Sequence, residues 1–479
     1  MDKKRLDDLI DTKKDIWISV SDKIWEYAET RFQEYQSEEL LCTALETEGF
    51  EIKRGIADIS TAFVGSFGSG SPVVAILGEY DALSGMSQKE GMAQKEPFAE
   101  GGNGHGCGHN MLGAGALAAA VAVKYYLEEN NIPGTIRYYG CPGEEGGSGK
   151  AFMTRAGVFD DVDVALTWHP LSHNAIFSIN TLANYQVYYK FTGISSHAGI
   201  SPHLGRSALD AVELMNVGVN YLREHIIQEA RIHYAVTNTG GVSPNVVQSE
   251  AEVLYLIRAP KMGQVQEIFE RVCNIAKGAT LMTGTECEII VDKACSNYIP
   301  NNTLEKLLYK NYQVVGVPQL DEQDKNFARE IRDTFTDANI KNDLLQAGAL
   351  MGGKGQEIVS ELKEKEIADV LLPYVYLSMS LSGSTDVGDV SWVVPTAQLS
   401  VACHALGTPA HSWQSVSQGV SGLAHKGILV AGKVIARTVI DIMIEPEVVA
   451  QAKAELQETI EGTKYVCPIP SGVKPSAIK

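Results

Sequence analysis

The sequence lacks the features that would mark a membrane protein or a disulfide-stabilised secreted protein. No run of about 18 or more apolar residues indicates a membrane-spanning helix. Residues 1–8 hold no apolar core of the kind that a signal peptide requires. The 8 cysteines are scattered along 479 residues and are not spaced as a disulfide framework. We therefore expect a cytoplasmic protein that has no membrane partner.

Positive charge is also in short supply. The chain has 40 lysines and arginines against 59 aspartates and glutamates, which gives a formal net charge of -19. This excess argues against nucleic acid or an anionic membrane surface as a partner. It does not exclude an anionic substrate, because a local metal site can carry positive charge. The length predicts two or three domains, and we find no internal repeats.

The first part of the chain alternates predicted helices and buried strands. Helical spacing of apolar residues covers much of residues 1–50. Short apolar runs predict buried strands at 73–77, 135–139 and 162–166, and an alanine-rich stretch predicts a helix at 112–127. This order predicts an α/β fold with a largely parallel sheet.

The pattern changes near Asn184 and returns to mixed helix and short strand near Pro300. The segment between these points has the order β-α-β-β-α-β, which is typical of a ferredoxin-like unit with an antiparallel sheet. We therefore predict a catalytic domain formed by residues 1–184 and 299–479, with a separate domain inserted at 185–298. The patterns that give this order lie at 185–191, 209–226, 232–236, 253–258, 265–279 and 288–291.

Two later segments differ in composition. Residues 320–370 are rich in charge, and we predict solvated helices and loops there without candidate chemistry. The mostly apolar stretch 422–443 predicts a helix that packs on the main sheet.

The segment from Gly101 to Asn110 is the most informative in the chain. Five of its ten residues are glycines, which let the backbone turn tightly and approach a bound ion. It places a thiol at Cys107 and an imidazole at His109, and both are good ligands for a divalent transition metal. The alternative is a flexible turn that carries polar residues. We favour the metal interpretation.

Glu144 and Glu145 follow the predicted strand 135–139 in a loop flanked by glycines. Loops beyond the carboxyl ends of strands are where open α/β sheets bind ligands. Adjacent buried carboxylates repel each other and need a cation or a shared proton. One of them can bind a metal while the other takes a proton from metal-bound water. For a lone pair of glutamates, an acidic surface loop is the commoner alternative.

Three further segments offer ligands, each with a weak signal of its own. His169 follows an apolar strand, where a lone histidine is more often a hydrogen-bonded core residue. His411 lies in a short polar segment, and Asp81 follows a strand and offers a carboxylate that can orient an imidazole. Taken together, several loops that supply cysteine, glutamate, aspartate and more than one histidine form the ligand inventory of a two-metal site.

With these segments in view, the sequence resembles the M20 metallopeptidase family from about residue 15 to 440. It is most similar to the branch of amidohydrolases that includes the aminobenzoyl-glutamate hydrolases, the aminoacylases and the auxin-conjugate hydrolases. The motifs specific to the resemblance are Gly104-His105-Gly106-Cys107-Gly108-His109-Asn110, Gly143-Glu144-Glu145-Gly146-Gly147, Ser196-His197-Ala198-Gly199 and Pro244-Asn245-Val246-Val247.

The resemblance implies a centre for two divalent metal ions, manganese or zinc, with Cys107 as the bridge between them. It implies that Glu144 is the general base, which would deprotonate the bridging water and later protonate the leaving amine. Asp81 matches an acidic residue that supports the site. The implied metal ligands are Cys107, His109, Glu145, His169 and His411.

The inserted unit resembles the family's lid and dimerisation domain. His197 on this unit matches a residue that stabilises the tetrahedral oxyanion, in some members from the neighbouring subunit. Asn245 matches a substrate-contacting position, and Gly383 and Ser384 match a loop near the substrate carboxylate. The resemblance therefore implies a homodimer, or a heterodimer with a homologous subunit.

The sequence departs from the family pattern at two places. Asn110 stands where many relatives of this branch have aspartate, and Gly383 to Asp389 replaces the commoner Gly-Ser-Glu-Asp-Phe pattern. Both variants are most similar to one group of aminobenzoyl-glutamate utilisation proteins and to dipeptidase-like proteins. His404 is a rival to His411 as the last metal ligand. His105 is a candidate for a residue that supports the ligands without binding the metal itself. The histidines interpreted as structural or exposed are His173, His203, His225, His233 and His425.

Our leading hypothesis is hydrolysis of the amide bond between an acyl or aroyl group and an amino acid by a metal-activated water. The first guess for the small-molecule substrate is p-aminobenzoyl-glutamate. One alternative is a dipeptidase of the same family that acts on a free-amino dipeptide. Another is a catalytically inert protein of the same fold with a binding or regulatory role.

Overall fold

The computed structural model describes residues 3–352, 355–377 and 383–477, which build two β-sheets. In spatial order, the main sheet contains seven strands: β1 (Glu51–Arg54), β2 (Phe63–Ser69), β4 (Gly134–Gly140), β3 (Val73–Gly78), β5 (Val164–Leu171), β11 (Thr396–Ala402) and β6 (Ala175–Ile176). The second sheet contains four, in the order β10 (Glu286–Cys295), β7 (Ala183–Thr192), β9 (Glu250–Ala259) and β8 (Arg231–Asn238).

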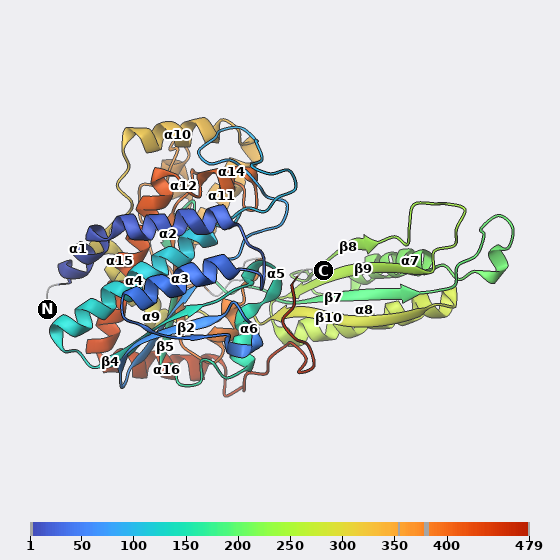
Figure 1. Ribbon diagram of the computed structural model, residues 1–479, viewed down its shortest axis with the longest axis horizontal. Helices are drawn as coiled ribbons and strands as arrows, with labels where there is room; N and C mark the ends of the chain where they lie inside the picture. The colour runs from blue at the N-terminus through green and yellow to red at the C-terminus, as the bar shows by residue number, and fades with distance from the viewer. Residues whose placement is uncertain (1–2, 353–354, 378–382, 478–479) are drawn as a thin grey trace.

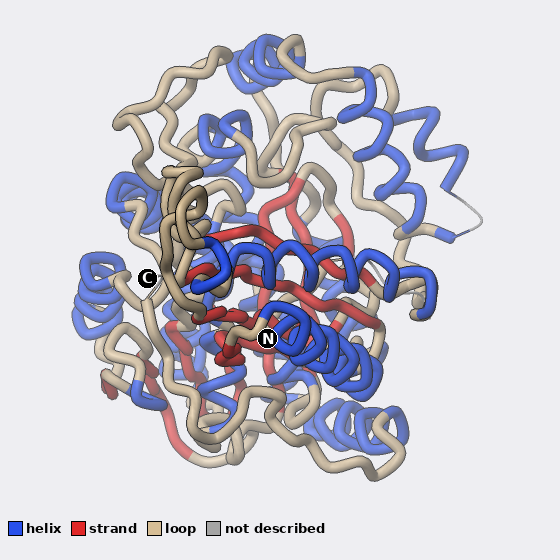
Figure 2. The backbone as a smooth tube through the Cα atoms, turned by 90° about the vertical axis from the view of Figure 1, so that its right-hand side faces the viewer, coloured by secondary structure: helices blue, strands red, loops and turns tan. Residues whose placement is uncertain are grey.

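Helices surround the strands of the main sheet, as Figure 2 shows in blue around red. The predicted N-terminal helices are observed as the first three of the chain. The helices outside the second sheet are α1 (Lys4–Thr12), α2 (Lys14–Tyr27), α3 (Tyr35–Thr47), α4 (His109–Asn130), α5 (Glu144–Gly147), α6 (Gly149–Arg155), α9 (Asn302–Val315), α10 (Glu322–Arg332), α11 (Asp337–Ala349), α12 (Gly355–Leu362), α13 (Val387–Ser391), α14 (Trp413–Gln418), α15 (Gly422–Ile444) and α16 (Pro446–Thr459).

The four central strands of the main sheet are parallel. β3 pairs in parallel with β4 and β5, and β11 pairs in parallel with β5. The pleat sends alternate side chains to opposite faces, so Val74 and Ile76 join one hydrophobic cluster while Ala75 and Leu77 join another. Both faces are therefore buried, as the continuous apolar runs predict. The predicted α/β fold is confirmed.

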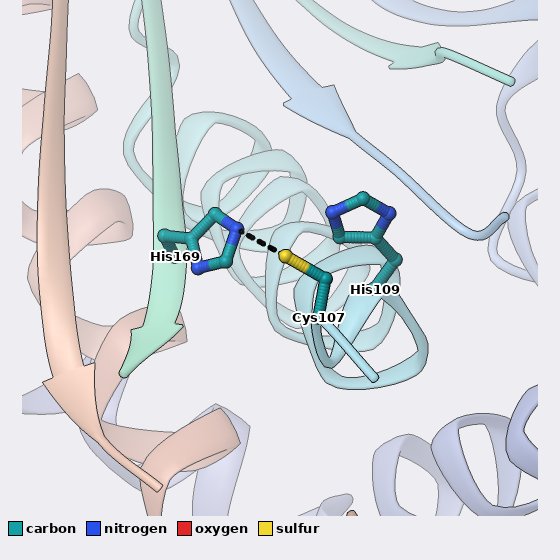
Figure 3. Close-up of side chains that lie close together, drawn as sticks. All are labelled: Cys107, His109 and His169. Carbon is teal, nitrogen blue, oxygen red and sulfur yellow. Dashed lines mark hydrogen bonds between the residues drawn. The ribbon is translucent and has the colours of Figure 1, made fainter. Parts of the chain in front are cut away.

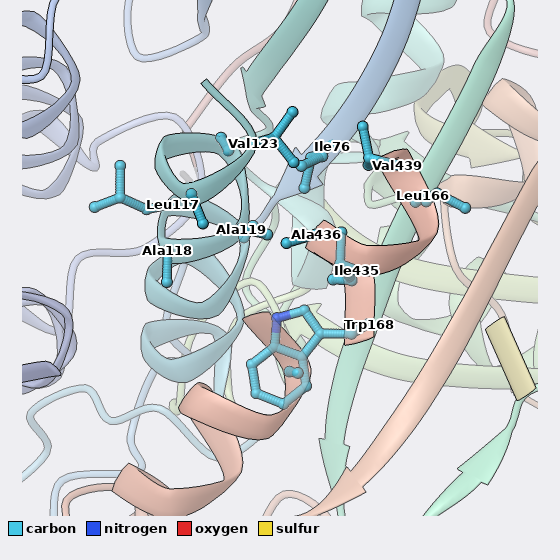
Figure 4. Close-up of a cluster of buried hydrophobic side chains, with 14 of the residues drawn as sticks. Ile76, Leu117, Ala118, Ala119, Val123, Leu166, Trp168, Ile435, Ala436 and Val439 are labelled. Atoms are coloured by element: carbon cyan, nitrogen blue, oxygen red, sulfur yellow. The ribbon is translucent and has the colours of Figure 1, made fainter. Parts of the chain in front are cut away.

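Helix α4 crosses one face of this sheet and packs against α15 (Figure 4). Its alanines and glycines allow the close approach: a Cβ on Gly115 would lie 2.8 Å from the Trp168 ring. By length and composition α4 could cross a membrane, but 94% of its apolar window is buried inside the molecule. It is the core helix of the main sheet.

The second sheet extends from the main body together with α7 (Ala208–Leu222) and α8 (Met262–Thr283) (Figure 1). The order β7-α7-β8-β9-α8-β10 is the predicted β-α-β-β-α-β unit, and every pairing in its sheet is antiparallel. The predicted helix through Ile226 ends earlier, at Leu222, where the 3₁₀ turn η3 (Arg223–His225) follows. The exact boundaries of the inserted domain stay a prediction.

The charged segment 320–370 is mainly helical, as predicted. Asp321 caps α10 by accepting the backbone N–H groups of Gln323 and Asp324, and Thr336 caps α11 by accepting that of Asn339. These helices pack against the loops at the carboxyl edge of the main sheet through two hydrophobic clusters that contain Leu406 and Ala405.

Glu305 on α9 is a fully buried carboxyl group. It accepts hydrogen bonds from the hydroxyls of Ser178 at 2.6 Å and Tyr374 at 2.9 Å. Burial raises the pKa of Glu305 to about 7. Because this value lies above that of the unfolded chain, the folded state keeps a proton that the unfolded state releases at lower pH. The resulting stabilisation is complete below the unfolded pKa and is lost as the pH rises through about 7.

We expect Glu305→Gln to remove this pH dependence, because the amide does not ionise. The free energy of unfolding of the wild type, relative to the variant, should fall by up to about 3 kcal/mol between roughly pH 5 and 8. Urea unfolding of both proteins at several pH values measures this difference. A difference that stays constant over the range would contradict the prediction.

Candidate metal centre

The predicted metal ligands meet at one edge of the main sheet. β3, β4 and β5 are parallel neighbours, so their carboxyl ends lie together there. Asp81 follows β3, Glu144 and Glu145 follow β4, and His169 lies near the end of β5. The glycine-rich segment with Cys107 leads into α4 at the same edge (Figure 3).

Cys107, His109 and His169 face one another (Figure 3). The Sγ atom of Cys107 lies 3.5 Å from Nε2 of His169, and each residue offers a ligand atom within 4.8 Å of the other two. Gly108, between the first two residues, has a φ of 76°. Glycine adopts this left-handed conformation without steric cost, and the resulting turn lets His109 begin α4.

Asp81 holds two of the candidate ligands in place. Its Oδ1 accepts a hydrogen bond from Nδ1 of His109 at 2.8 Å, and its Oδ2 accepts the backbone N–H of Glu145 at 2.8 Å. A carboxylate can only accept, so Nδ1 of His109 carries a proton, and Nε2 is the nitrogen that a metal can bind once it is deprotonated. Asp81 thereby fixes the tautomer that a metal requires.

Two further groups of donors surround the first. Nε2 of His411 lies 3.5 Å from Oε1 of Glu145, and these residues form a second group with Cys107, again with all ligand atoms within 4.8 Å. Cys107 is shared by two groups, as the predicted bridge requires. Glu144 lies outside both groups that contain Cys107, but it forms a third group with Glu79 and His109, and its Oε2 is 4.0 Å from Nε2 of His109.

Burial shifts the pKa values of these groups. It raises the pKa of Glu145 to about 8 and also raises that of Glu144. It lowers the pKa of His169 to about 3, so this imidazole is neutral. Burial would lower the pKa of His109 too, but the carboxylates of Asp81 and Glu79 raise it well above its ordinary value. A divalent cation among these groups would favour the carboxylate and the metal-binding, deprotonated nitrogen.

The donor set fits a pair of divalent ions. Nε2 of His109 and Oε1 of Glu145 are buried, and within the described part of the chain they have no hydrogen-bond partner. Buried polar atoms are almost always paired, so both atoms are suited to an external ligand. A thiol, imidazoles and a carboxylate are the donors that zinc prefers, and the harder ones also suit manganese.

A buried ion network, which the sequence analysis missed, lies against His109. Nζ of Lys150 contacts Oε1 of Glu79 at 2.5 Å and Oδ1 of Asp386 at 2.7 Å, and Oε2 of Glu79 is 3.2 Å from Nε2 of His109. Burial would lower the pKa of Lys150, but the two carboxylates raise it well above its ordinary value. The one sequence signal was the position of Glu79, which follows the same strand as Asp81.

Arg258 is a second residue that the sequence analysis missed. It lies near the end of β9 and donates a hydrogen bond to Oγ of Ser384 at 3.2 Å. Burial lowers the pKa of His411, and the charges of His109 and Arg258 lower it further. Burial likewise lowers the pKa of Arg258, while the Glu144 carboxylate opposes this shift. The contact with Ser384 places the guanidinium beside a residue that is two positions along the chain from Asp386, whose carboxylate binds Lys150 in the ion network against His109.

Three other predicted residues have different surroundings. The Gly383 carbonyl accepts the backbone N–H of Leu182. His197 and Asn245 lie in exposed loops after β7 and β8, and neither hydrogen-bonds to the cluster among the described residues. β7 runs away from the main body (Figure 1), and a strand of 10 residues spans roughly 30 Å. Both residues are therefore at the far end of the second sheet.

Strand β10 brings the second sheet into contact with the loop of the two glutamates. Nζ of Lys293 donates to the backbone carbonyl of Glu145 at 3.2 Å. The Arg31 guanidinium makes two 3.0 Å hydrogen bonds to Asp292 and also donates to the carbonyl of Gly146. The predicted strand 288–291 is thus longer than expected, and its extension carries these contacts.

The remaining candidates near the cluster differ in role. His105 is buried and its Nε2 lies 2.9 Å from the carbonyl of Ile24, so it supports the fold. Asn110 donates to Oγ of Ser21 at 3.0 Å. His404 is buried but belongs to none of the three donor groups, whereas its rival His411 does.

Comparisons with known proteins identify a family and several relatives to which this chain is similar. A model described as peptidase family M20/M25/M40 matches residues 75–473. One subunit of the p-aminobenzoyl-glutamate hydrolase of Escherichia coli (strain K12) is 50% identical over 474 residues, which cover 99% of this chain and 98% of that protein. The Xaa-Arg dipeptidase of Mus musculus is 26% identical over 472 residues, covering 95% of this chain and 92% of that protein.

A solved structure shares the fold. The aminobenzoyl-glutamate utilization protein from Klebsiella pneumoniae aligns with a TM-score of 0.55 at 15% identity, over 88% of this chain and 98% of that chain. At this identity the likeness concerns the architecture alone, and it agrees with the two-sheet arrangement described above.

We expect Asp81→Asn to weaken metal binding by about 10- to 100-fold, because an amide can donate to Nδ1 of His109 and shift the ring proton onto Nε2. Titration of the metal-free protein with Zn²⁺ or Mn²⁺ measures the change. Asp160→Asn, at an exposed position, is the matched control. Equal metal affinity in the two folded variants would contradict the role assigned to Asp81.

Proposed function

The chain belongs to peptidase family M20/M25/M40, and on this premise we propose that it cleaves the amide bond of an N-acyl or aroyl amino acid. Family membership and the 50% identity with the Escherichia coli protein make it a metal-dependent hydrolase of amide bonds. The activity named for that relative supports p-aminobenzoyl-glutamate as the substrate.

The position of Glu144 carries the proposal. Cys107 belongs to the two donor groups that contain a thiol, and Glu144 belongs to neither of them but lies beside them in a third group with Glu79 and His109. Two divalent ions, manganese or zinc, would polarise the scissile carbonyl and acidify a water molecule when bound there. The Glu144 carboxylate is then free to accept a proton from the attacking water and to deliver it to the leaving amine.

Arg258 supplies the recognition that an amino-acid product requires. We propose that its guanidinium and the Ser384 hydroxyl, 3.2 Å apart, bind the carboxylate of the amino-acid half. A guanidinium matches a carboxylate in charge and in geometry. With the carboxylate held there, the amide bond would extend from Ser384 toward the donor cluster, because Asp386 on the same loop binds Lys150 in the ion network against His109.

We further propose that the second sheet binds a partner chain, which is either a second copy of this chain or a homologous chain. β8 is an edge strand, and its residues 233–238 are exposed, which leaves one side of the backbone open for pairing. Val217 and Tyr221 of α7 are also exposed. The Escherichia coli relative is one of two subunits that carry the same enzyme name, which favours a heteromer of homologous chains. A partner could bring its His197 to this cluster, which the chain's own His197 does not reach.

A dipeptidase is the second candidate function. The dipeptidase from Mus musculus covers nearly the whole chain at 26% identity, so the same centre could cleave a peptide bond with a free amino group next to it. A dipeptide substrate needs an anionic or polar side chain of the protein near its ammonium group, whereas an N-acylated amino acid does not. Comparing p-aminobenzoyl-glutamate with free dipeptides distinguishes the two. A catalytically inert protein with a binding or regulatory role would hydrolyse neither.

We expect Glu144→Gln to lower kcat on p-aminobenzoyl-glutamate by about 10²- to 10⁴-fold, because the amide cannot move the proton. The variant should still bind two ions per chain, since Glu144 belongs to neither group that contains Cys107. Steady-state kinetics and metal analysis measure both quantities. Glu145→Gln is the contrasting variant and should lose metal as well. Undiminished hydrolysis by Glu144→Gln would remove this residue from the mechanism.

We expect Arg258→Ala to lower kcat/KM by about 10- to 100-fold for substrates with a free carboxylate, the range expected for a lost charged hydrogen bond. A substrate in which that carboxylate is replaced by a carboxamide should be affected much less. Kinetics with the paired substrates give the comparison. An equal loss on both would assign Arg258 to the fold of the site and not to carboxylate recognition.

A further inference from the structure

Helix α11, in the segment without predicted chemistry, has two distinct faces. Ile340, Leu344 and Ala347 follow helical spacing and pack in a hydrophobic cluster with Leu406. The other face is polar and follows the same spacing. Its residues are Asn339, Asn342, Asp343 and Gln346.

The polar face of α11 lines a cavity of about 250 Å³ beside the metal centre. Cys107 and His169 form part of the same wall, so the cavity opens next to the candidate ions. Arg258 and Ser384 do not line it. The cavity is therefore distinct from the place proposed for the substrate carboxylate.

The shape and chemistry of the cavity restrict its ligand. Its volume lies below the roughly 300–1,000 Å³ of sites for drug-sized molecules, which suits one ring and not a whole substrate. Apolar parts of the wall come from Pro170, Leu171 and Phe177 and from Pro409 and Ala410. Polar groups come from α11 and from the loops that carry Ser172, His173, His404 and Thr408.

The polar end of the cavity is built in a fixed position. The Asp343 carboxylate accepts the Ser172 hydroxyl at 2.7 Å and the backbone N–H of Gly407 at 2.7 Å, which ties α11 to two loops of the main sheet. The side chains of Asn342 and Gln346, next to Asp343, are exposed and make no hydrogen bond among the described residues.

Two buried imidazoles complete this end. His173 is 4% exposed and His404 is 5% exposed, and both line the cavity. Nε2 of each lacks a hydrogen-bond partner in the described ranges of the chain. Oδ2 of Asp343 lies 3.6 Å from Nε2 of His173, a residue interpreted from the sequence as structural or exposed. Among the described residues, the ring nitrogen that lacks a partner at this cavity is therefore chiefly that of His404, the rejected metal ligand.

We propose that this cavity is the acyl-side subsite of the hydrolase and takes a flat aromatic acyl group with a polar substituent. The inference rests on the proposed function, since it assumes that the amino-acid half binds at Arg258. The apolar walls contact the faces of the ring, and the carboxamides of Asn342 and Gln346 hydrogen-bond the substituent.

The kinetic test compares p-aminobenzoyl-glutamate, benzoyl-glutamate and acetyl-glutamate. In the double variant Asn342→Leu/Gln346→Leu, kcat/KM for the p-amino substrate should fall about tenfold, the size expected for neutral hydrogen bonds. The value for acetyl-glutamate should change by less than about twofold. Lys341→Ala, at an exposed position of α11 outside the cavity, is the control and should leave all three values unchanged.

A binding test on the full-length protein uses 4-aminobenzamide and benzamide, which lack a carboxylate. The wild type should bind the first more tightly by about tenfold, and the double variant should lose this preference. Equal losses on all three substrates, or a preference kept by the double variant, would overturn the subsite. If the wild type hydrolyses none of the substrates, the proposed function fails, and the binding preference alone then decides whether the cavity recognises the ring.

Discussion

Asp81 joins the two halves of the metal centre through a single carboxylate. One oxygen fixes the tautomer of His109, and the other holds the backbone of Glu145 on a different loop. The arrangement gathers several buried acidic groups in one place, where like charges resist ionisation together. Lys150 compensates Glu79, so the remaining negative charge is concentrated among the metal donors. The centre is consequently organised by charges that bound cations would balance, which couples metal binding to the order of both loops.

The direction of the strands decides which parts of the second sheet can act at this centre. β9 and β10 run antiparallel to β7, so they end near the main body, while β7 and β8 end far from it. Lys293 therefore reaches the backbone of Glu145 and Arg258 reaches Ser384, whereas His197 lies at the far end of the sheet. Arg31 clamps β10 to the glutamate loop by binding both Asp292 and the carbonyl of Gly146. These contacts tie the second sheet to the backbone that carries Glu144.

The sequence was sufficient for features that depend on local pattern. Apolar runs and helical spacing identified the parallel strands and the β-α-β-β-α-β unit, and glycine-flanked loops identified Cys107 and the glutamate pair. It was insufficient where distant segments meet. Lys150 and Asp386 are far apart in the sequence but form an ion pair, and neither lies in a local motif that predicts a buried charge. Arg258 looked like an ordinary polar position on an alternating strand. The sequence could not identify the cavity face of α11, because amides on a charged helix resemble an ordinary solvated surface. Only the structure shows that the loop of His404 lies beside them.

The overall charge of the chain is opposite to the charge that an acyl-glutamate substrate needs to find at its binding site. A net charge of -19 would repel such a dianion if it were spread evenly. In the structure, the local charge at the site differs from the net charge of the whole chain. In the proposed function Arg258 binds the amino-acid carboxylate, and Lys150 contacts the carboxylates of both Glu79 and Asp386, which offsets part of their charge. Bound divalent ions would neutralise Glu145 and Cys107 in turn. The cavity at α11 carries amides and neutral, buried imidazoles in place of exposed acids, with Asp343 held by hydrogen bonds at its base. A local field of the right sign can therefore develop inside an acidic protein, and it depends on the metal ions being present.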